Sequence, residues 1–567
     1  MTASRWGAAL AITGLLLVSA CGDDDDDDAE GTEETAEATG DADTAETEAT
    51  GEATEATGEA TVPSATEAEQ PTEEATAEDG ATTTLRARFA SDPTLLDPIY
   101  VANYTDISLV SIMIETLIEE GPVGDVVPVL ADTWTVSDDG LTIDFTLKQG
   151  IQFHGGYGEM TMDDVKFAIE RSAGLDPTIE TTSITAFFTA LESVDVIDQY
   201  TGRLTLKEPS VTLVEQALPL TGIISKKAYE EKGVEGFQQH PIGTGPYQFD
   251  ETVPGEHVRL TNFTEYGGQA PWVPDERYDE LIFQIIPEDS AAELAYEAGD
   301  LDLLALMRAA AFDRFSALGD TTITEGAGMQ YRFIGMNSID PALSNPDLRN
   351  AIINAIDVES ILIATSEGRD VRATALVAPS APIGYWADAP VHEQDLDEAR
   401  RLVELVPEAD RTLKFTVADD EISRTVAQIA QANLQDAGLT VNIEVLDPAA
   451  FFVADETNRS RQLFYTEYGI NYREPSQELV WFTCDQFDIW NYVYFCDENY
   501  DRLFEEAGVT LDDEARNEKY IEMQQIWEEA ANTVWVSHPT TLVAARDNVS
   551  VQVNEAGTVY YQTLAPA

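Results

Sequence analysis

Basic residues are scarce in this chain of 567 residues, which has 31 Lys and Arg against 106 Asp and Glu. The formal net charge of −75 excludes nucleic acid and anionic lipid surfaces as natural partners, because both are polyanions that repel an acidic protein. The acidity favours solubility and has two explanations, a saline habitat or an acidic surface with no role in the choice of ligand.

Motifs for catalysis and for metal binding are also missing. The sequence contains no H-E-x-x-H, G-x-S-x-G, S-x-x-K, G-x-x-x-x-G-K or C-x-x-C pattern. None of the five histidines has a second histidine three or four residues away, as a helical metal site requires. The histidines are His154, His240, His257, His392 and His538. We therefore expect no metal, no cofactor and no enzymatic activity, although missing motifs alone do not exclude an enzyme.

The chain has three cysteines, two of which are close together near its end. Cys484 and Cys496 suggest one disulfide that closes a loop, because their number is even and the expected compartment is oxidising. Their spacing is far from any zinc-binding pattern. Two free buried thiols are the alternative.

The third cysteine, Cys21, ends a segment that resembles a bacterial lipoprotein signal. Arg5 gives a positive start, an uncharged and mostly apolar stretch follows, and small residues lead to Cys21. The stretch is short for a membrane-spanning helix, so we expect cleavage after residue 20. Cys21 would then carry lipid and anchor the protein at the outer face of the cytoplasmic membrane, in the periplasm or on the cell surface. A plain secretory signal with a coincidental cysteine is the alternative.

An acidic segment follows Cys21 and extends to about residue 83. Residues 22–80 contain no Lys, Arg or aromatic residue, begin with a run of Asp and continue in loose Glu-Ala-Thr repeats. Such a segment buries too little apolar surface to offset the entropy of ordering, and its like charges repel. We expect an extended, disordered stalk.

The segment around residues 130–171 predicts a hairpin followed by a helix. Alternating apolar residues indicate strands over 134–136 and 141–147, joined by a turn in which Gly140 supplies a positive φ. Thr161 is placed to cap a helix over 165–171. Further along, the sequence predicts a β-α-β unit with strands at 413–417 and 441–445 and a helix between them at 421–437.

The hairpin and helix resemble the signature region of the peptide/nickel family (family 5) of ABC-transporter solute-binding proteins, which includes oligopeptide- and dipeptide-binding proteins. Other segments match the family in the correct order between about residues 84 and 553. They are Leu95-Leu-Asp-Pro98, Pro241-Ile-Gly-Thr-Gly-Pro-Tyr-Gln-Phe249, Pro254-Gly255, Tyr266-Gly267, Asn337, Leu348–Asp357, Asn499–Leu503 and Arg516–Trp527.

The resemblance implies an α/β, two-lobed, periplasmic-binding-protein-like fold of the cluster C type, with a hinge and an extra domain inserted in lobe 1. Hinge closure traps the ligand between such lobes. We assign residues 84–121, 241–328 and 536–567 to lobe 1, residues 122–240 to the inserted domain and residues 329–535 to lobe 2.

The function implied by the resemblance is that of a lipid-anchored, monomeric receptor. It would capture a peptide or peptide-like solute and deliver it to the permease subunits of an ABC importer. Two other functions remain open, a surface-anchored hydrolase and a sensor that reports ligand to a receptor protein.

The choice of ligand depends on the segment from Tyr468 to Ser476. In peptide-binding relatives, an Asp four residues before a Pro pairs with the ligand's α-ammonium group. Here Asn471 stands four residues before Pro475. Because an amide is a poorer partner for a buried ammonium than a carboxylate, we expect a free-amino peptide not to be the optimal ligand. The alternative is that Glu467 or Glu474 replaces the missing acid.

Aromatic residues are expected to line the cleft between the lobes, where flat apolar walls and a few polar anchors hold a solute. The candidates, which could equally belong to the core, are Tyr100, Tyr104, Tyr468, Tyr472, Trp481 and Trp490. Arg473 could bind a ligand carboxylate, but we expect it to pair with the neighbouring Glu474.

Overall fold

The computed structural model describes residues 82–567, apart from 102, 123–125, 180–181, 453–458, 470–473 and 555–556. The expected signal segment, Cys21 and the acidic stalk lie outside the described residues, as do Asn471, Tyr472 and Arg473. No helix in the described part is long and apolar enough to cross a membrane.

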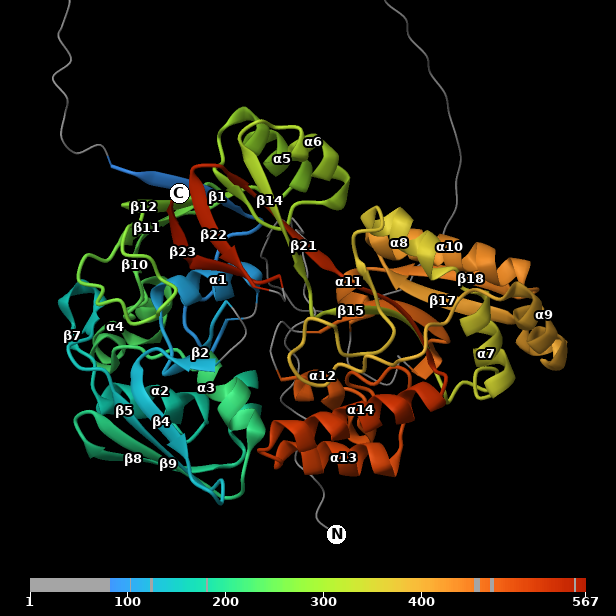
Figure 1. Cartoon of the computed structure of the whole chain (residues 1–567), viewed down its shortest axis with the longest axis horizontal. Helices are drawn as coiled ribbons and strands as arrows, with labels where there is room; N and C mark the ends of the chain where they lie inside the picture. The colour runs from blue at the N-terminus through green and yellow to red at the C-terminus, as the bar shows by residue number, and fades with distance from the viewer. Residues whose placement is uncertain are drawn as a thin grey trace, which may run out of the picture. The chain divides into compact units, whose positions relative to one another are not determined.

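Two large sheets organise the described chain (Figure 1). The seven-stranded sheet has the order β10 (Tyr247–Val253), β11 (His257–Asn262), β12 (Glu280–Ile285), β1 (Thr84–Phe89), β13 (Leu303–Leu304), β21 (Thr540–Arg546) and β14 (Thr321–Ala327). The six-stranded sheet has the order β16 (Val371–Arg372), β20 (Thr533–His538), β15 (Tyr331–Met336), β19 (Leu463–Tyr468), β17 (Thr412–Ala418) and β18 (Thr440–Leu446).

Both faces of the six-stranded sheet are buried, and the alternation of side chains along each strand divides them into two cores. Ile334 and Met336 of β15 face one core, which is covered by α7 (Pro346–Ala355), α8 (Val358–Ser366), α9 (Leu396–Leu405) and α10 (Glu421–Asp436). Tyr331 and Phe333 face the other core, which is covered by α12 (Ser476–Val480), α13 (Glu498–Gly508) and α14 (Asp513–Glu529). The second core is strongly aromatic.

The seven-stranded sheet is buried in the same way. Leu303 of β13 joins the core under α1 (Tyr104–Met113) and α4 (Lys226–Gln239). The next residue, Leu304, joins the core under α5 (Asp289–Ala298) and α6 (Phe312–Ser316). The described chain ends in the hairpin of β22 (Val549–Val553) and β23 (Val559–Pro566), whose apolar residues complete the first of these cores.

A four-stranded antiparallel sheet forms a third unit, with the order β4 (Ala131–Val136), β5 (Thr142–Leu147), β9 (Thr201–Leu206) and β8 (Leu191–Asp198). The predicted hairpin is confirmed as β4 and β5, and Gly140 in its turn has φ 69°. The predicted helix is confirmed as α2 (Met162–Ser172), where Thr161 and Asp164 form a capping box. Short two-stranded sheets lie nearby, β2 (Ile118–Glu120) with β3 (Val126–Pro128) and β6 (Gln152–Phe153) with β7 (Gly158–Glu159).

The predicted β-α-β unit is confirmed as β17, α10 and β18, and its two strands are parallel neighbours. Asp420 begins α10 by accepting a hydrogen bond from the backbone N–H of Ser423. Val426, Ala430 and Leu434 then lie on one buried face of the helix.

Residues of the Leu95–Pro98 motif meet α2 through a buried ion pair. Arg171 Nη2 lies 2.7 Å from Asp97 Oδ2, and the two side chains are 1% and 0% exposed. The motif residue Asp97 therefore joins the segment after β1 to the unit that contains the four-stranded sheet.

The Gly-Thr-Gly-Pro motif lies against the end of α1. A Cβ atom on Gly243 would lie 2.2 Å from the carbonyl oxygen of Met113, and one on Gly245 would lie 2.4 Å from that of Ile112. Thr244 Oγ1 between them donates to Glu115 Oε2 at 2.8 Å. Glycine is required at both positions because two backbone segments touch there.

The chain passes between the two large sheets twice, from β14 to β15 and from β20 to β21. The two crossings are joined to each other, since the backbone N–H of Gly328 donates to the carbonyl of Pro539 at 2.9 Å. A Cβ atom on Gly328 would lie 2.4 Å from the same carbonyl oxygen. The crossings therefore form one narrow double connection between the sheets.

Candidate functional site

The candidate ligand segment begins where β19 ends, at Tyr468, and leads into α12. Its central residues 470–473, which include Asn471 and Tyr472, lie outside the described residues. Gly469 has φ 123°, and a Cβ atom there would lie 2.7 Å from Cα of Gln330. The segment therefore leaves the sheet directly beside the crossing from β14 to β15.

Three of the expected aromatic residues form one cluster. The ring centroid of Tyr468 lies 5.2 Å from that of Trp481 and 5.9 Å from that of Trp490, and the two Trp rings are 6.0 Å apart. The hydroxyl of Tyr468 donates to the carbonyl of Trp490 at 3.0 Å. Trp481 Nε1 is buried with no hydrogen-bond acceptor among the described residues. All three side chains are buried in the aromatic core under α12, α13 and α14, at 5%, 3% and 9% exposure, where they form one packed cluster with one unused donor.

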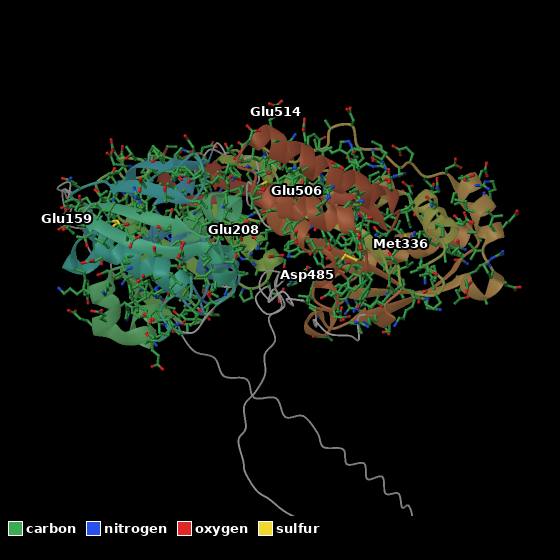
Figure 2. The ribbon with its side chains drawn as sticks, turned by 90° about the horizontal axis from the view of Figure 1, so that it is seen from below. Glu159, Glu208, Met336, Asp485, Glu506 and Glu514 are labelled. Atoms are coloured by element: carbon green, nitrogen blue, oxygen red, sulfur yellow. A yellow bond between two sulfur atoms is a disulfide. The ribbon has the colours of Figure 1, made fainter. Side chains whose placement is uncertain are left out.

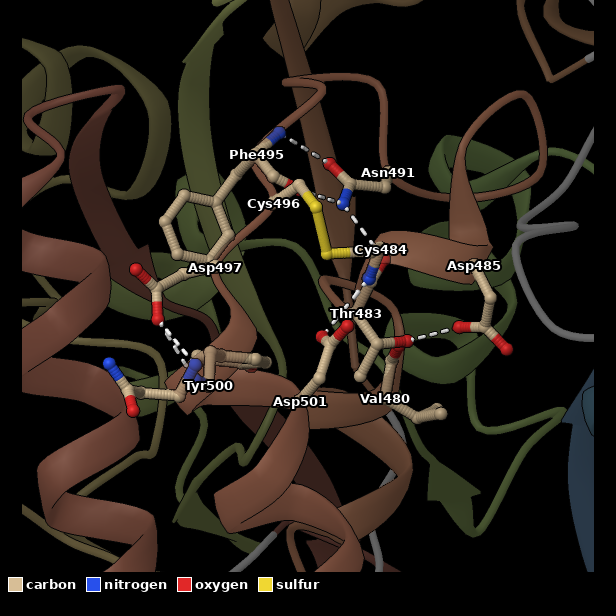
Figure 3. The surroundings of a disulfide bond; sticks show 11 residues. Val480, Thr483, Cys484, Asp485, Asn491, Phe495, Cys496, Asp497, Tyr500 and Asp501 are labelled. Carbon is tan, nitrogen blue, oxygen red and sulfur yellow. Dashed lines mark hydrogen bonds between the residues drawn. A yellow bond between two sulfur atoms is a disulfide. The ribbon is translucent and has the colours of Figure 1, made fainter.

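A disulfide closes the loop that carries Trp490. Cys484 is bonded to Cys496, as the sequence suggested (Figure 3). Inside the loop the buried side chain of Asn491 donates to the carbonyls of Thr483 and Phe495 at 3.1 and 2.7 Å and accepts from the N–H of Phe495. The loop is fixed by a covalent bond and by three side-chain hydrogen bonds, and sequence reasoning did not single out Asn491.

Both acids that could replace an Asp at position 471 have basic partners. Glu467 Oε2 lies 2.6 Å from Arg332 Nε. Glu474 Oε2 lies 3.1 Å from Arg516 Nε, and Tyr520 donates its hydroxyl to the other carboxylate oxygen. Burial raises the pKa of Glu474, and Arg516 opposes that shift. Glu474 therefore pairs with Arg516, 42 positions along the chain. Its expected pairing with Arg473 lies outside the described residues and stays a prediction.

The remaining aromatic candidates have other surroundings. Tyr104 is 39% exposed at the start of α1, and its hydroxyl lies 3.2 Å from that of Tyr561. Tyr100 is half-buried and packs against the core beside the four-stranded sheet.

A group of acids near Tyr104 in sequence was not singled out beforehand, because carboxylates are abundant throughout the chain. Glu119 Oε1 accepts from Gln562 Nε2 at 3.2 Å. Burial, Glu115 and Glu120 raise the pKa of Glu119 to about 8. Burial also raises the pKa of Glu115 to about 7, although Thr244 and Tyr266 donate hydrogen bonds to it.

The histidines are not arranged as a catalytic or metal-binding group. His154 and His538 are buried and bond backbone carbonyls, those of Gly245 and Gln330, at 2.9 and 3.0 Å. Burial lowers the pKa of each to about 4. Within the described part of the chain, no group of three or more His, Cys, Asp and Glu side chains could hold a metal ion.

Comparison with known proteins gives three kinds of similarity. A sequence model of the bacterial extracellular solute-binding proteins, family 5 Middle, matches residues 125–488. Di/tripeptide-binding protein 1 of Pseudomonas aeruginosa is 26% identical over 454 residues, which cover 75% of this chain and 82% of that protein.

Solved structures share the fold. The periplasmic binding protein DppA of Helicobacter pylori in complex with the peptide STSA has a TM-score of 0.69 at 22% identity, covering 84% of this chain and 98% of that one. NikA of Brucella suis in complex with Fe(III)-EDTA has a TM-score of 0.75 at 20% identity, covering 85% of this chain and all of the other. The same two-lobed fold therefore holds a peptide in one protein and a metal chelate in another.

Proposed function

This chain belongs to the family 5 bacterial extracellular solute-binding proteins, and we propose that it captures a peptide or peptide-like solute between two lobes and delivers it to an ABC importer permease. The observation that carries the proposal is that, within the described chain, the backbone passes between the two large sheets only at two adjacent crossings. A narrow double connection of this kind suits hinge closure around a solute. The protein acts as a monomer and catalyses no reaction.

The domains assigned from the sequence fit this role. Residues 84–121, 241–328 and 536–567 form lobe 1, which contains the seven-stranded sheet, and residues 329–535 form lobe 2. The inserted domain of residues 122–240 extends lobe 1. β20, a strand of the six-stranded sheet, continues to His538, three positions beyond the assigned end of lobe 2 at residue 535.

The solute contacts come from both lobes. Tyr468, Trp481 and Trp490 supply the aromatic wall in lobe 2, and Asn471 and Tyr472 contact the solute from the segment after β19. Tyr100 and Tyr104 supply contacts from lobe 1. The exposed ring of Tyr104 and the unused Trp481 Nε1 support these assignments.

The solute lacks a free α-ammonium group. Asn471 provides no charge, and Glu467 and Glu474 are already paired with Arg332 and Arg516. A buried ammonium without a carboxylate partner costs about 2–5 kcal/mol of affinity. A blocked or cyclic peptide, a sugar or a metal chelate fits this surrounding better.

The protein is held at the outer face of the cytoplasmic membrane by lipid on Cys21. The signal-like segment and the acidic stretch after it support this placement. In cell fractionation, Cys21→Ser should move the protein from the membrane fraction to the soluble extracytoplasmic fraction. A variant that stays in the membrane fraction would contradict the lipid anchor.

A thermal-shift screen of the purified protein tests solute binding. Tri-alanine is compared with N-acetyl-tri-alanine, sugars and nickel chelates, each over a wide concentration range. A solute at a hundred times its Kd adds about 2.7 kcal/mol of stability, which is readily detected. Stabilisation by any of these solutes supports a binding protein, and turnover of the solute would instead indicate an enzyme.

A further inference from the structure

One side chain reaches from the unit of the four-stranded sheet to the candidate ligand segment. Gln216 lies in η3 (Leu213–Ala217), a single π-helical turn that continues into α3 (Leu218–Leu220). Its Nε2 donates to the carbonyl of Glu474 at 2.8 Å and to Ser476 Oγ at 3.3 Å. Glu474 directly follows residues 470–473. Isolated π-turns inside helices occur frequently at functional sites, where they redirect a side chain.

The contact between Gln216 and the ligand segment is buried. Gln216 is 1% exposed, and Glu474 and Ser476 are 1% and 5% exposed. The contact joins η3, which leads into α3, to the start of α12. A second contact joins the same parts, because a Cβ atom on Gly140 would lie 3.0 Å from Leu511 Cδ1. The two units thus meet at a second place besides the crossings.

The residue that accepts this bond is anchored to lobe 2. The carboxylate of Glu474 is bonded by Arg516 and Tyr520 of α14. A hydrogen-bond donor is required here, because both partners of Gln216 Nε2 accept a hydrogen bond. An ionised carboxylate at position 216 would place an acceptor against the carbonyl of Glu474, whereas the amide donates to it.

We infer that Gln216 is a positioning residue for solute capture, which bonds the inserted domain to the backbone of the ligand segment and so holds the two lobes closed. The role of Gln216 in solute capture rests on the proposed function. The bond itself requires only that the lobes stay in their present arrangement, because separation by about 1 Å takes the two atoms beyond hydrogen-bond distance.

Spin labels on the two sides of the contact test the inference. Glu208→Cys and Glu514→Cys place labels at two exposed positions, one before η3 and one on α14 (Figure 2). The full chain carries Cys21→Ser so that no other free thiol is present, since Cys484 and Cys496 are bonded to each other. The distance distribution is measured without solute and with N-acetyl-tri-alanine or tri-alanine.

Gln216→Ala should lower the ratio of short to long distances by about 3- to 10-fold, the range that one buried neutral hydrogen bond supplies. Gln216→Glu should lower it at least as much, and Ser476→Ala, which removes the weaker acceptor from the other lobe, should lower it less. Gln239→Ala changes an exposed glutamine of α4 in the same domain and should have no effect. Circular dichroism establishes that each variant is folded.

The inference would be overturned if both Gln216 variants gave the same distance distribution as the unchanged protein. If no probe solute binds, the proposed function fails, but this inference is still tested. The spin labels report the contact between the lobes without any solute. Where a probe solute binds, its apparent Kd should rise as the closed fraction falls. Equal Kd values together with a lower closed fraction would also overturn the role in capture.

Discussion

Glu467 Oε2 lies 2.6 Å from Arg332 Nε, so the acid that precedes the candidate ligand segment already has a cation. Arg332 also binds Asp370, at 2.7 Å, and Asp370 accepts a hydrogen bond from the N–H of Thr540 just beyond the crossing. Glu467 therefore belongs to the structure of the crossing and is not available to a ligand ammonium.

Asn471→Asp should strengthen binding of a free-amino peptide. The new carboxylate supplies the charge that an ammonium needs, and we expect tri-alanine to bind about 30-fold or more tightly than to the unchanged protein. N-acetyl-tri-alanine should not gain, because it carries no ammonium group. Isothermal titration calorimetry measures both, with Asn471→Ala as the control. Equal affinity of the unchanged protein for the two peptides would contradict the assigned solute class.

Removal of the disulfide should weaken the loop that carries Trp490. We expect the double variant Cys484→Ser, Cys496→Ser to lose about 3 kcal/mol of unfolding free energy, because the open loop gains entropy in the unfolded chain. Urea unfolding followed by tryptophan fluorescence measures the loss. Cys21→Ser is the control and should leave the unfolding free energy unchanged. A loss of the same size in the control would show that the loss does not come from opening the loop.

Glu115→Gln should change how stability depends on pH. Burial raises the pKa of Glu115 to about 7, above its ordinary value of 4.5. The folded protein then holds a proton that the unfolded chain releases, so this residue lowers the unfolding free energy as pH rises from about 4.5 to about 7.

The glutamine variant lacks this titration. Its unfolding free energy relative to the unchanged protein should therefore rise with pH by about 3 kcal/mol across the same interval and stay constant above it. Urea unfolding at several pH values measures the difference in unfolding free energy between the two proteins. The contributions of titratable groups that both proteins share largely cancel in this difference. A difference that does not vary with pH would mean that Glu115 is ionised throughout.

Arg171→Met should destabilise the fold strongly, because it leaves the carboxylate of Asp97 buried without its cation. A loss of about 3–5 kcal/mol is expected, and adding Asp97→Asn should recover part of it. Arg203→Met is the matched control, since its ion pair with Asp144 is 45% and 43% exposed and should contribute less than about 1 kcal/mol. Thermal and urea unfolding measure both. Similar losses for the two variants would contradict the role of burial.

Elements with local signals could be predicted from the sequence. The hairpin of β4 and β5, the capped helix α2 and the β17-α10-β18 unit follow from alternation, helical spacing and capping residues within short windows. The partners of buried polar groups could not be predicted in this way. Thr244 bonds Glu115 across 129 positions and Gln216 bonds Glu474 across 258, so no local pattern indicates either contact.

The candidate site was predictable in part for the same reason. Tyr468, Trp481 and Trp490 are close in sequence, and the structure brings them together. The pairing of Glu474 with Arg516 depends on how α14 packs against α12, which composition does not reveal. The place of Asn471 stays a prediction from the sequence.

The strand order also has a consequence for how the molecule is made. β20 lies between β16 and β15 in one sheet, and β21 lies between β13 and β14 in the other, yet both strands come from residues 533–546 of a chain of 567. A nascent chain emerging from the ribosome therefore lacks an interior strand of each sheet until residues 533–546 have been synthesised. Neither half can finish folding early, and a protein that works outside the cytoplasm remains incompletely folded until its last strands are available.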